Sequence, residues 1–566
     1  MTVAAPAAMR RAWVRAAVTP DLLVLAGVAG ASLVLVALTW GTWGDLDNDT
    51  GYDLVAGFKV AHGEVPYRDF FYWYGPLAPA LFGLAALVGG GGVAPAVTLG
   101  LLVAFATVGA TYALARTHAG PLGAGIAAAL AASVAFSPNQ FSFVLPHTGD
   151  ASLGALLLVL CVLALEKRNL AVAGALAGAT ALTKPEFALA ALAGSAALLV
   201  VSRSRRDAVR FALPAAAIPA VVYGAFLTQV SLHRLVFENL YPQDFFRIAG
   251  DTMLRARFPL SASSVLELGG RLGLYALGVA AIVSLARSRE RSRRRASLLA
   301  GSVLAVAVLG SLARPELLRH ALHFAWGWIP AGAVVGAVIL WRRRSRTGIA
   351  ESAALAVLAG TTYAAFFVEA WSPQMAVYAV PLAASFLVRL HLTELRRAAW
   401  LGALWLAFLA AATTGLALKD ARAESATVRG PGGAVNESPD KAAVYQRAVD
   451  LIVARTRPGE PILIAPQLTA LYALSGRVNP LPQLSLLPGA LASPAEERAA
   501  IHRLDDAGVR LVVTDRRTYD GYGHTRFGGS FDRILAAWVR SHFAHIATVR
   551  DAATSPTLDV WSRRAP

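Results

Sequence analysis

The sequence has little of two things, cysteine and charge. Cys161 is the single cysteine in 566 residues, and it lies in an apolar run. One cysteine excludes a disulfide framework and a cysteine-based zinc site. Charged residues make up only 15% of the chain and hydrophobic residues 56%, whereas soluble domains are about 25% charged. This composition argues against a soluble protein and for one with membrane-spanning helices.

The basic residues lie in short clusters between the apolar runs, and this distribution argues against a nucleic-acid-binding groove. The formal net charge is +17, which alone would suggest a polyanion as partner. Much of the Lys and Arg, however, forms short clusters at 10–15, 203–206, 287–295, 342–346 and 389–397. Basic residues concentrated in the loops on one side of a membrane follow the positive-inside rule. We therefore expect no nucleic acid among the partners.

The apolar runs predict an α-helical polytopic membrane protein. Runs of about 18 or more apolar residues with few charges are typical of transmembrane helices. The apolar segments are 21–43, 76–89, 93–115, 121–136, 150–166, 169–183, 186–202, 208–229, 264–287, 296–313, 324–341, 350–368, 374–391 and 398–418. The first is too long for a signal-peptide core, so residues 1–20 are expected in the cytoplasm.

The positive-inside rule then predicts about thirteen crossings within residues 21–418. It places the loops 44–75 and 137–150 on the outer face, so an even number of crossings must separate them. Three apolar segments lie between these loops. One of 76–89, 93–115 and 121–136 is therefore not a full span.

The sequence changes character after Leu418. Residues 419–437 are polar and contain Gly and Pro, which predicts a linker. Residues 438–566 then alternate between expected helices at 439–456, 494–508 and 530–543 and expected strands at 461–466, 509–514, 545–550 and 557–562. This alternation predicts a small extracytoplasmic α/β domain. It has no Gly-rich phosphate loop or nucleophile elbow, so we expect an accessory domain that covers the outer face or binds an acceptor.

The first outer loop, 44–75, is the densest patch of polar chemistry in the first third of the chain. Asp45, Asp47, Asp49 and Asp53 fall close together, and an aromatic run follows at 70–74. Clustered carboxylates suit proton abstraction or metal binding. The aromatic run has the composition of a belt at a membrane–water boundary.

The second outer loop, 137–150, ends in Asp150 where an apolar run begins. Either Asp150 acts in a site shared with the first loop, or it caps the helix that follows, since Asp is a favoured N-cap residue. The same two roles are open to Asp49. His147 would contact a phosphate or simply be a polar residue at the boundary.

Several strings of the sequence resemble the GT-C glycosyltransferases, which include the protein O-mannosyltransferases and the lipid A aminoarabinose transferases. In the first loop these are Asp49-Thr50-Gly51-Tyr52-Asp53-Leu54, Gly63-Glu64-Val65-Pro66-Tyr67-Arg68-Asp69 and Gly75-Pro76-Leu77; Thr183-Lys184-Pro185 resembles a later motif. The chain departs from the family at Thr50, where an acidic residue is common, and at Gly75, where a proline is common.

The resemblance implies a GT-C fold and transfer of a sugar from a polyprenyl-phosphate donor to a hydroxyl acceptor on the outer face, usually with inversion. A hydroxyl is a poor nucleophile, so such an enzyme needs a carboxylate base. Asp49 matches the family's catalytic position, and Asp150 resembles its second acidic position.

Two further expectations concern ligands of this site. Asp47 and Asp49 form an Asp-x-Asp pair, which in related oligosaccharyltransferases belongs to a divalent-metal site; Mg²⁺ or Mn²⁺ would suit such oxygen ligands, but many family members need no metal. The departing lipid phosphate needs positive charge or hydrogen-bond donors. The residues expected to supply them are Lys59, Arg68, His147, Lys184, His233 and Arg234.

The sequence therefore favours an integral membrane glycosyltransferase with Asp49 as general base. A transporter or flippase of lipid-linked saccharide, or a relative that binds polyprenyl lipid without catalysis, stays open as an alternative. The richness in Ala, Gly, Arg and Pro suggests a bacterial plasma membrane. Expected partners are membrane lipids, the lipid-linked donor, and a glycan, lipid or protein acceptor.

Overall fold

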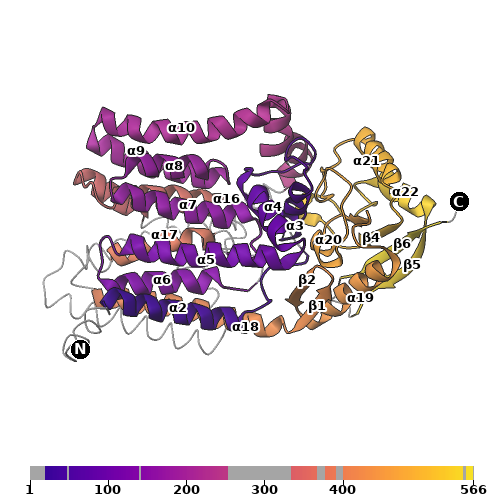
Figure 1. Cartoon of the computed structure of the whole chain (residues 1–566), viewed down its shortest axis with the longest axis horizontal. Coiled ribbons are helices and arrows are strands. Elements are labelled where there is room, and N and C mark those ends of the chain that lie inside the picture. Colours follow the sequence, from indigo (N-terminus) through magenta and orange to yellow (C-terminus); the bar gives the residue numbers. More distant parts are fainter. Residues whose placement is uncertain are drawn as a thin grey trace, which may run out of the picture.

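A computed structural model describes residues 19–47, 50–138, 142–252, 333–365, 376–390, 399–551 and 556–564. Its helices pack side by side in one part of the molecule, and the C-terminal part lies against one end of them (Figure 1). The expected segments 264–287 and 296–313 fall outside the described residues.

Five of the described helices are long and apolar enough to cross a membrane. They are α2 (Pro20–Leu38), α5 (Val93–Ala115), α7 (Gly149–Glu166), α9 (Pro185–Ser202) and α10 (Arg205–Leu227). Further helices of this part are α4 (Leu77–Gly89), α6 (Pro121–Ala135), α8 (Leu170–Thr180), α16 (Ile349–Ala365), α17 (Val380–Val388) and α18 (Ala399–Ala423). These helices confirm the predicted helical membrane-protein class.

Among the three segments between the two outer loops, α4 is the shortest helix. It has 13 residues, whereas α6 has 15 and α5 has 23. At about 1.5 Å per residue α4 spans roughly 20 Å, less than the roughly 30 Å of a bilayer core. It packs on α3 (Thr50–Ala61), the helix of the first loop.

Small residues let neighbouring helices of this part approach closely. A Cβ atom on Gly174 of α8 would lie 2.1 Å from the carbonyl oxygen of Phe211 in α10. One on Gly194 of α9 would lie 2.7 Å from the carbonyl oxygen of Ala350 in α16. Packing of backbone against backbone is typical of helices in membranes, where van der Waals contact replaces the hydrophobic effect between helices.

Shorter elements connect these helices. Residues after α10 form η1 (Arg234–Leu240), α11 (Gln243–Phe245) and η2 (Phe246–Gly250), and η3 (Ala376–Ala379) precedes α17. The segment from η1 to η2 packs on the first loop, because Trp73 lies with its ring centroid 4.5 Å from that of Phe245.

The C-terminal part is an α/β unit. A hairpin of β1 (Ala426–Gly430) and β2 (Gly433–Glu437) precedes α19 (Pro439–Arg455), β3 (Leu463–Ala465), α20 (Ala470–Ser475), α21 (Pro494–Asp506), β4 (Leu511–Asp515), η6 (Asp520–Tyr522), α22 (Arg533–His542), β5 (Phe543–Val549) and β6 (Leu558–Arg563). The four-stranded sheet has the order β3-β4-β6-β5; β3 and β4 are parallel and the other pairs antiparallel. The predicted small sheet is confirmed, and the hairpin occupies the stretch expected to be a linker.

The C-terminal part is packed directly on the first loop and its helix. A Cβ atom on Gly51 of α3 would lie 1.9 Å from the backbone nitrogen of Ala470 in α20. The backbone N–H of Phe71 donates to the carbonyl of Pro482 over 2.9 Å. In Figure 1, α3 and α4 accordingly lie between the other helices and the C-terminal part. The first loop is therefore a buried layer and not a free solvent loop.

Candidate active site

Two aspartates from distant parts of the chain meet at one tyrosine. Asp53 lies in the first turn of α3 and Asp150 in the first turn of α7. The hydroxyl of Tyr72 lies 2.5 Å from Oδ1 of Asp53 and 2.8 Å from Oδ2 of Asp150. Asp53 is 2% exposed, and Asp150 and Tyr72 are 0% exposed. The first and second acidic segments thus form one buried cluster.

The Tyr72 hydroxyl alone cannot donate a hydrogen bond to two ionised carboxylates. A phenol donates one proton, and the Tyr72 hydroxyl contacts both acids. Backbone N–H groups supply two more donors: Gly149 donates to Oδ2 of Asp53, and Ala78 donates to Oδ1 of Asp150 over 3.4 Å. Acids coupled this closely titrate as a pair, so the protonation of one depends on that of the other.

The tyrosine stays in its neutral form. Burial raises the pKa of Tyr72 well above its ordinary value, and the carboxylates of Asp150 and Asp53 raise it further. Tyr72 is also stacked on Tyr52, with centroids 5.4 Å apart. Its role in the cluster is therefore that of a fixed hydrogen-bond donor.

Lys184 supplies a cation beside this cluster. Its side chain is 10% exposed, and its Nζ lies 4.8 Å from the ring centroid of Tyr74. Tyr74 in turn packs edge-on against Tyr72. Lys184 interacts electrostatically with Asp150 and forms an ion pair with Glu186 over 3.3 Å. A cation over an aromatic face in a poorly solvated place is a favourable arrangement.

The two sequence motifs around Gly75 and Lys184 are hydrogen-bonded to each other. Gly75 N–H donates to the carbonyl of Thr183 and Leu77 N–H to that of Leu182, both over 3.1 Å. A Cβ atom on Gly75 would lie 2.1 Å from the carbonyl carbon and oxygen of Leu182. This close approach explains why the chain has glycine where its resemblance leads one to expect proline. The contact also holds Lys184 next to the first loop.

Arg68 and Arg234 lie side by side at the edge of the first loop. Nη2 of Arg234 donates to the carbonyl of Arg68 over 2.7 Å, and its guanidinium lies 5.7 Å from the ring centroid of Phe71. Arg68 forms an ion pair with Asp69 over 2.7 Å. Both arginines are partly exposed, and Arg234 also lies 3.9 Å from a carboxylate oxygen of Glu238.

The other expected phosphate ligands lie in different settings. Lys59 is buried and pairs with Glu64 over 2.9 Å. His233 is 71% exposed and lies 3.6 Å from Glu238. His147 is partly exposed, two residues before α7. The structure brings Lys184 to the acidic cluster and joins Arg68 to Arg234; the roles of Lys59, His147 and His233 stay predictions.

Asp47 is bound by the C-terminal part. Its carboxylate forms an ion pair with Lys441, and its carbonyl accepts a hydrogen bond from Nη1 of Arg517 over 2.7 Å. Asp49 lies outside the described residues. No group of three or more His, Cys, Asp or Glu in the described part of the chain could hold a metal ion. Because Lys441 already neutralises Asp47, its carboxylate fits a metal ligand poorly.

Glu437 of β2 lies next to these residues. Its Oε1 accepts the backbone N–H of Leu46 over 3.0 Å. Burial and the neighbouring Asp45 together raise the pKa of Glu437 to about 7. The first loop and β2 therefore meet through a carboxyl group that keeps its proton to nearly neutral pH.

Sequence reasoning did not select Asp53, Tyr72 or Arg517 as site residues. Asp53 follows Asp49 by four residues, one helical turn, and this spacing was the available signal. The local sequence places Tyr72 in an aromatic run that is typical of a membrane boundary. Nothing in the local sequence signals Arg517, because its contact with the first loop joins residues far apart in the chain.

Several known structures are similar to this chain over most of its length. The Archaeoglobus fulgidus oligosaccharyltransferase in complex with Zn and sulfate is 14% identical, over 93% of this chain and 73% of that one, with a TM-score of 0.49. ArnT from Cupriavidus metallidurans bound to undecaprenyl phosphate is 15% identical, over 95% and 97%, with a TM-score of 0.40. The arabinofuranosyltransferase AftD from Mycobacteria is 14% identical, over 95% and 41%, with a TM-score of 0.40.

No protein-family model and no curated protein matches the sequence. The three similar structures are GT-C glycosyltransferases, the superfamily that the first loop resembles. At these identities and TM-scores the likeness bears on the role of no residue. The function proposed below therefore depends on the contacts of this chain.

Proposed function

We propose that the protein is an integral membrane glycosyltransferase that moves a sugar from a polyprenyl-phosphate donor to a hydroxyl acceptor. One observation carries the proposal: Asp53 and Asp150 meet at Tyr72, beside Lys184, in a predominantly helical, apolar protein. Buried acids in unusual surroundings, with a cation nearby, are typical of functional sites.

The proposed reaction is a single displacement. The acceptor oxygen attacks the anomeric carbon while the bond from that carbon to the phosphate oxygen breaks. The acceptor proton passes to the carboxylate of Asp49, and the polyprenyl phosphate departs with the electron pair. Asp49 directly precedes α3, the helix that carries Asp53, so the proposed base and the acidic cluster belong to one segment.

Cations near the cluster suit a departing phosphate. Lys184 interacts with Asp150, and Arg68 and Arg234 lie together at the edge of the same loop. Positive groups placed where negative charge develops stabilise the transition state. We assign Lys184 and the two arginines to the phosphate.

The proposal includes a location. The donor would reach the site through lipid, and the acceptor from the side of the C-terminal part. We place the protein in a bacterial plasma membrane with its N-terminus in the cytoplasm and its C-terminal part outside. The basic clusters between apolar runs support this orientation.

The test uses cells that lack the protein. Without transfer, the lipid-linked donor should accumulate, and mass spectrometry of extracted polyprenyl-phosphate saccharides identifies it. Wild-type protein should restore the donor to its ordinary level, whereas Asp49→Asn should not. Asp244→Asn is the control, because Asp244 is exposed and pairs with Arg247, which has no part in the proposed site.

Three outcomes would count against the proposal. Full function of Asp49→Asn removes Asp49 as the base. An unchanged pool of lipid-linked saccharides in the cells that lack the protein removes the donor class. Accumulation of that donor on one leaflet, with no transfer by the purified protein, supports a flippase instead.

A further inference from the structure

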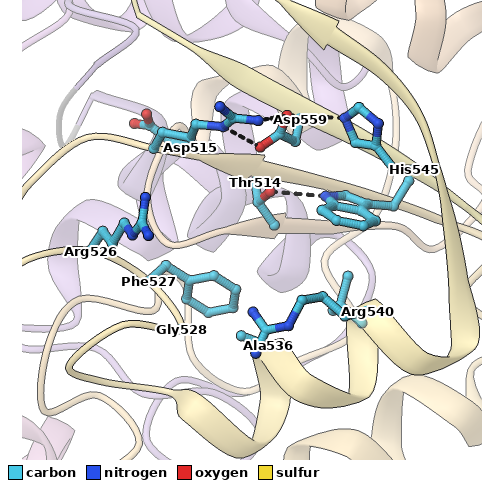
Figure 2. A pocket seen from close by; sticks show the side chains of 12 residues that line it. Thr514, Asp515, Arg526, Phe527, Gly528, Ala536, Arg540, His545 and Asp559 are labelled. Carbon is cyan, nitrogen blue, oxygen red and sulfur yellow. Dashed lines mark hydrogen bonds and ion pairs between the residues drawn. The ribbon is translucent and has the colours of Figure 1, made fainter.

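The C-terminal part contains a cavity that is separate from the acidic cluster. Its volume is about 370 Å³. Residues of β4, α22, β5, β6 and the loop before α22 line it, and Figure 2 shows Arg526, Phe527 and Arg540 across from Thr514 and His545. Cavities of roughly 300 Å³ and more that mix ring faces with a few polar groups are typical of small-ligand sites.

The acids of this cavity are already matched by other groups. Asp559 accepts two hydrogen bonds from Arg516, over 2.6 and 2.8 Å. Burial raises the pKa of Asp559, but the hydrogen bonds from Arg516, Thr548 and His545 outweigh this and hold it below its ordinary value. It therefore stays ionised and neutralises Arg516.

The other acid, Asp515, is paired with an arginine outside the cavity lining. It forms an ion pair with Arg517 over 2.9 Å, and its Oδ1 accepts the backbone N–H of the same residue. Asp515 and Asp559 are thus both occupied. Neither is available to neutralise a further cation in the cavity.

Two arginines of the cavity are left without a carboxylate partner among the described residues. These are Arg526, in the loop before α22, and Arg540, near the end of α22. Both are exposed. A guanidinium binds a carboxylate or a phosphate through two parallel hydrogen bonds. The cavity therefore offers excess positive charge to an anion.

A glycine fixes the distance between the loop and Arg540. Gly528 has a φ of +71°, and a Cβ atom there would lie 2.4 Å from Cβ of Ala536 and 3.3 Å from Nη1 of Arg540. The loop thus lies directly on α22. This packing brings the guanidinium of Arg540 to the loop that carries Arg526.

The rest of the lining suits a sugar ring. Trp561 is partly buried, and its indole N–H donates to Oγ1 of Thr514 over 3.0 Å. Its ring is held edge-on against His545, with centroids 5.0 Å apart. Phe527 adds a second partly buried ring. Fixed ring faces pack against the apolar face of a pyranose, and the surrounding polar groups pair with its hydroxyls.

We propose that this cavity binds an anionic saccharide, a sugar that carries a carboxylate or a phosphate. Arg526 and Arg540 bind the anionic group, and Trp561 and Phe527 contact the ring. That this saccharide belongs to the acceptor rests on the proposed function, whereas its binding does not.

A short chain of contacts joins the cavity to the first loop. Asp515 in the cavity wall holds Arg517, and Arg517 donates to the carbonyl of Asp47. An acceptor held in the cavity would therefore be anchored to the same structure that holds the loop of Asp49.

The experiment measures binding to the purified full-length protein by isothermal titration calorimetry. The probes are a glucuronate-containing disaccharide, the matching neutral disaccharide and inorganic phosphate. We expect the acidic disaccharide to bind at least tenfold more tightly than the other two. Arg526→Gln and Arg540→Gln should each weaken it at least tenfold. Arg533→Gln, at the exposed start of the same helix, should leave binding unchanged.

Each contrary result overturns the proposal. Equal binding of the neutral disaccharide removes the role of charge, and equal binding of phosphate removes the role of the sugar. Absence of binding, or full binding by both arginine variants with unfolding temperatures like wild type, removes the site. Asp49→Asn should bind the acidic disaccharide normally while transfer is lost, so a failure of the proposed function is distinguishable from a failure of this inference.

Discussion

The two ends of α7 each bury a carboxylate, but they treat it in opposite ways. Glu166 at the end of the helix accepts the backbone N–H of Gly348 over 2.7 Å and lies 3.2 Å from Nη2 of Arg389. Arg389 also pairs with Glu351 over 2.7 Å. At the start of α7, Asp150 instead shares the Tyr72 hydroxyl with Asp53, a second acid.

The difference separates a structural use of charge from a functional one. Removing one partner of a buried ion pair leaves an uncompensated charge, so the Glu166–Arg389–Glu351 group keeps three segments of the fold together. Two acids at one hydroxyl repel each other when both are ionised. About 24 Å of helix separates the two settings. The acids at the end of α7 meet at a cation, whereas those at its start meet at a neutral hydroxyl.

The sharpest way to break this comparison is to neutralise the acids at the start of α7. Asp53→Asn and Asp150→Asn should each lower transfer by about a hundredfold or more, the range of proton-transfer groups. Stability should stay equal or rise, because a like charge is removed. Turnover of lipid-linked donor by purified protein and the unfolding temperature test both points. Full transfer with lowered stability would make the cluster structural.

At the other end of α7, loss of the cation should act on stability. Arg389→Met leaves Glu166 and Glu351 buried without a cation, and we expect the free energy of unfolding to fall by about 3–5 kcal/mol. The measurement is unfolding in detergent by heat or denaturant. Adding Glu166→Gln and Glu351→Gln should restore much of the loss. If transfer per folded molecule falls as well, the two ends are not separate in function.

A third buried acid tests whether a buried carboxylate that lacks hydrogen-bond partners among the described residues is by itself a sign of a functional site. Asp532 of the C-terminal part is 4% exposed, and neither carboxylate oxygen has a hydrogen-bond partner among the described residues. Burial raises its pKa well above the ordinary value, and Glu497 raises it further.

Asp532→Asn should therefore stabilise the protein by about 1–3 kcal/mol at neutral pH and leave transfer unchanged. Asparagine also tolerates the positive φ of 49° at this position. The unfolding temperature at pH 7 is the readout, with the exposed Asp520→Asn as control. A loss of transfer at wild-type stability would give Asp532 a role of its own.

The last expected effect appears only above about pH 4.5 and concerns the boundary between β2 and the first loop. The pKa of Glu437 rises from 4.5 to about 7, chiefly through burial. A raised pKa means that its contribution to stability is fully present below about pH 4.5 and is lost as the pH rises through about 7.

Glu437→Gln should keep that contribution at every pH, because the amide resembles the protonated acid. We expect a gain of up to about 3 kcal/mol at pH 8, with no difference from wild type at pH 4. Unfolding temperatures from pH 4 to 8 check this. A gain that is equal at both ends of the range would mean that Glu437 does not titrate there.

The sequence predicted most elements of the fold but only part of the site. Apolar length gave α5 at 93–115, and alternating patterns gave β4 and α21 to within a few residues. Local patterns suffice for such elements because one helix or strand carries its own signal. Residues 426–437 were expected to be a linker, yet they form a hairpin that bonds to Gly41 through Asn436.

The site is harder to predict because its residues are brought together by tertiary contacts. Asp150 and Lys184 could be selected from their positions at the starts of apolar runs. Asp53 can be recognised as a site residue only from its contact with Tyr72, which also contacts Asp150. Contacts between residues this far apart leave no trace in one sequence, and the same holds for Arg517.

The C-terminal part is synthesised last, although it holds the first loop in place. Proteins emerge from the ribosome N-terminus first, yet the segment around Asp47 is held by Lys441 and Arg517, which are translated hundreds of codons later. The first loop is therefore synthesised long before the residues that hold it, and its packed arrangement forms only after the C-terminal part has been made.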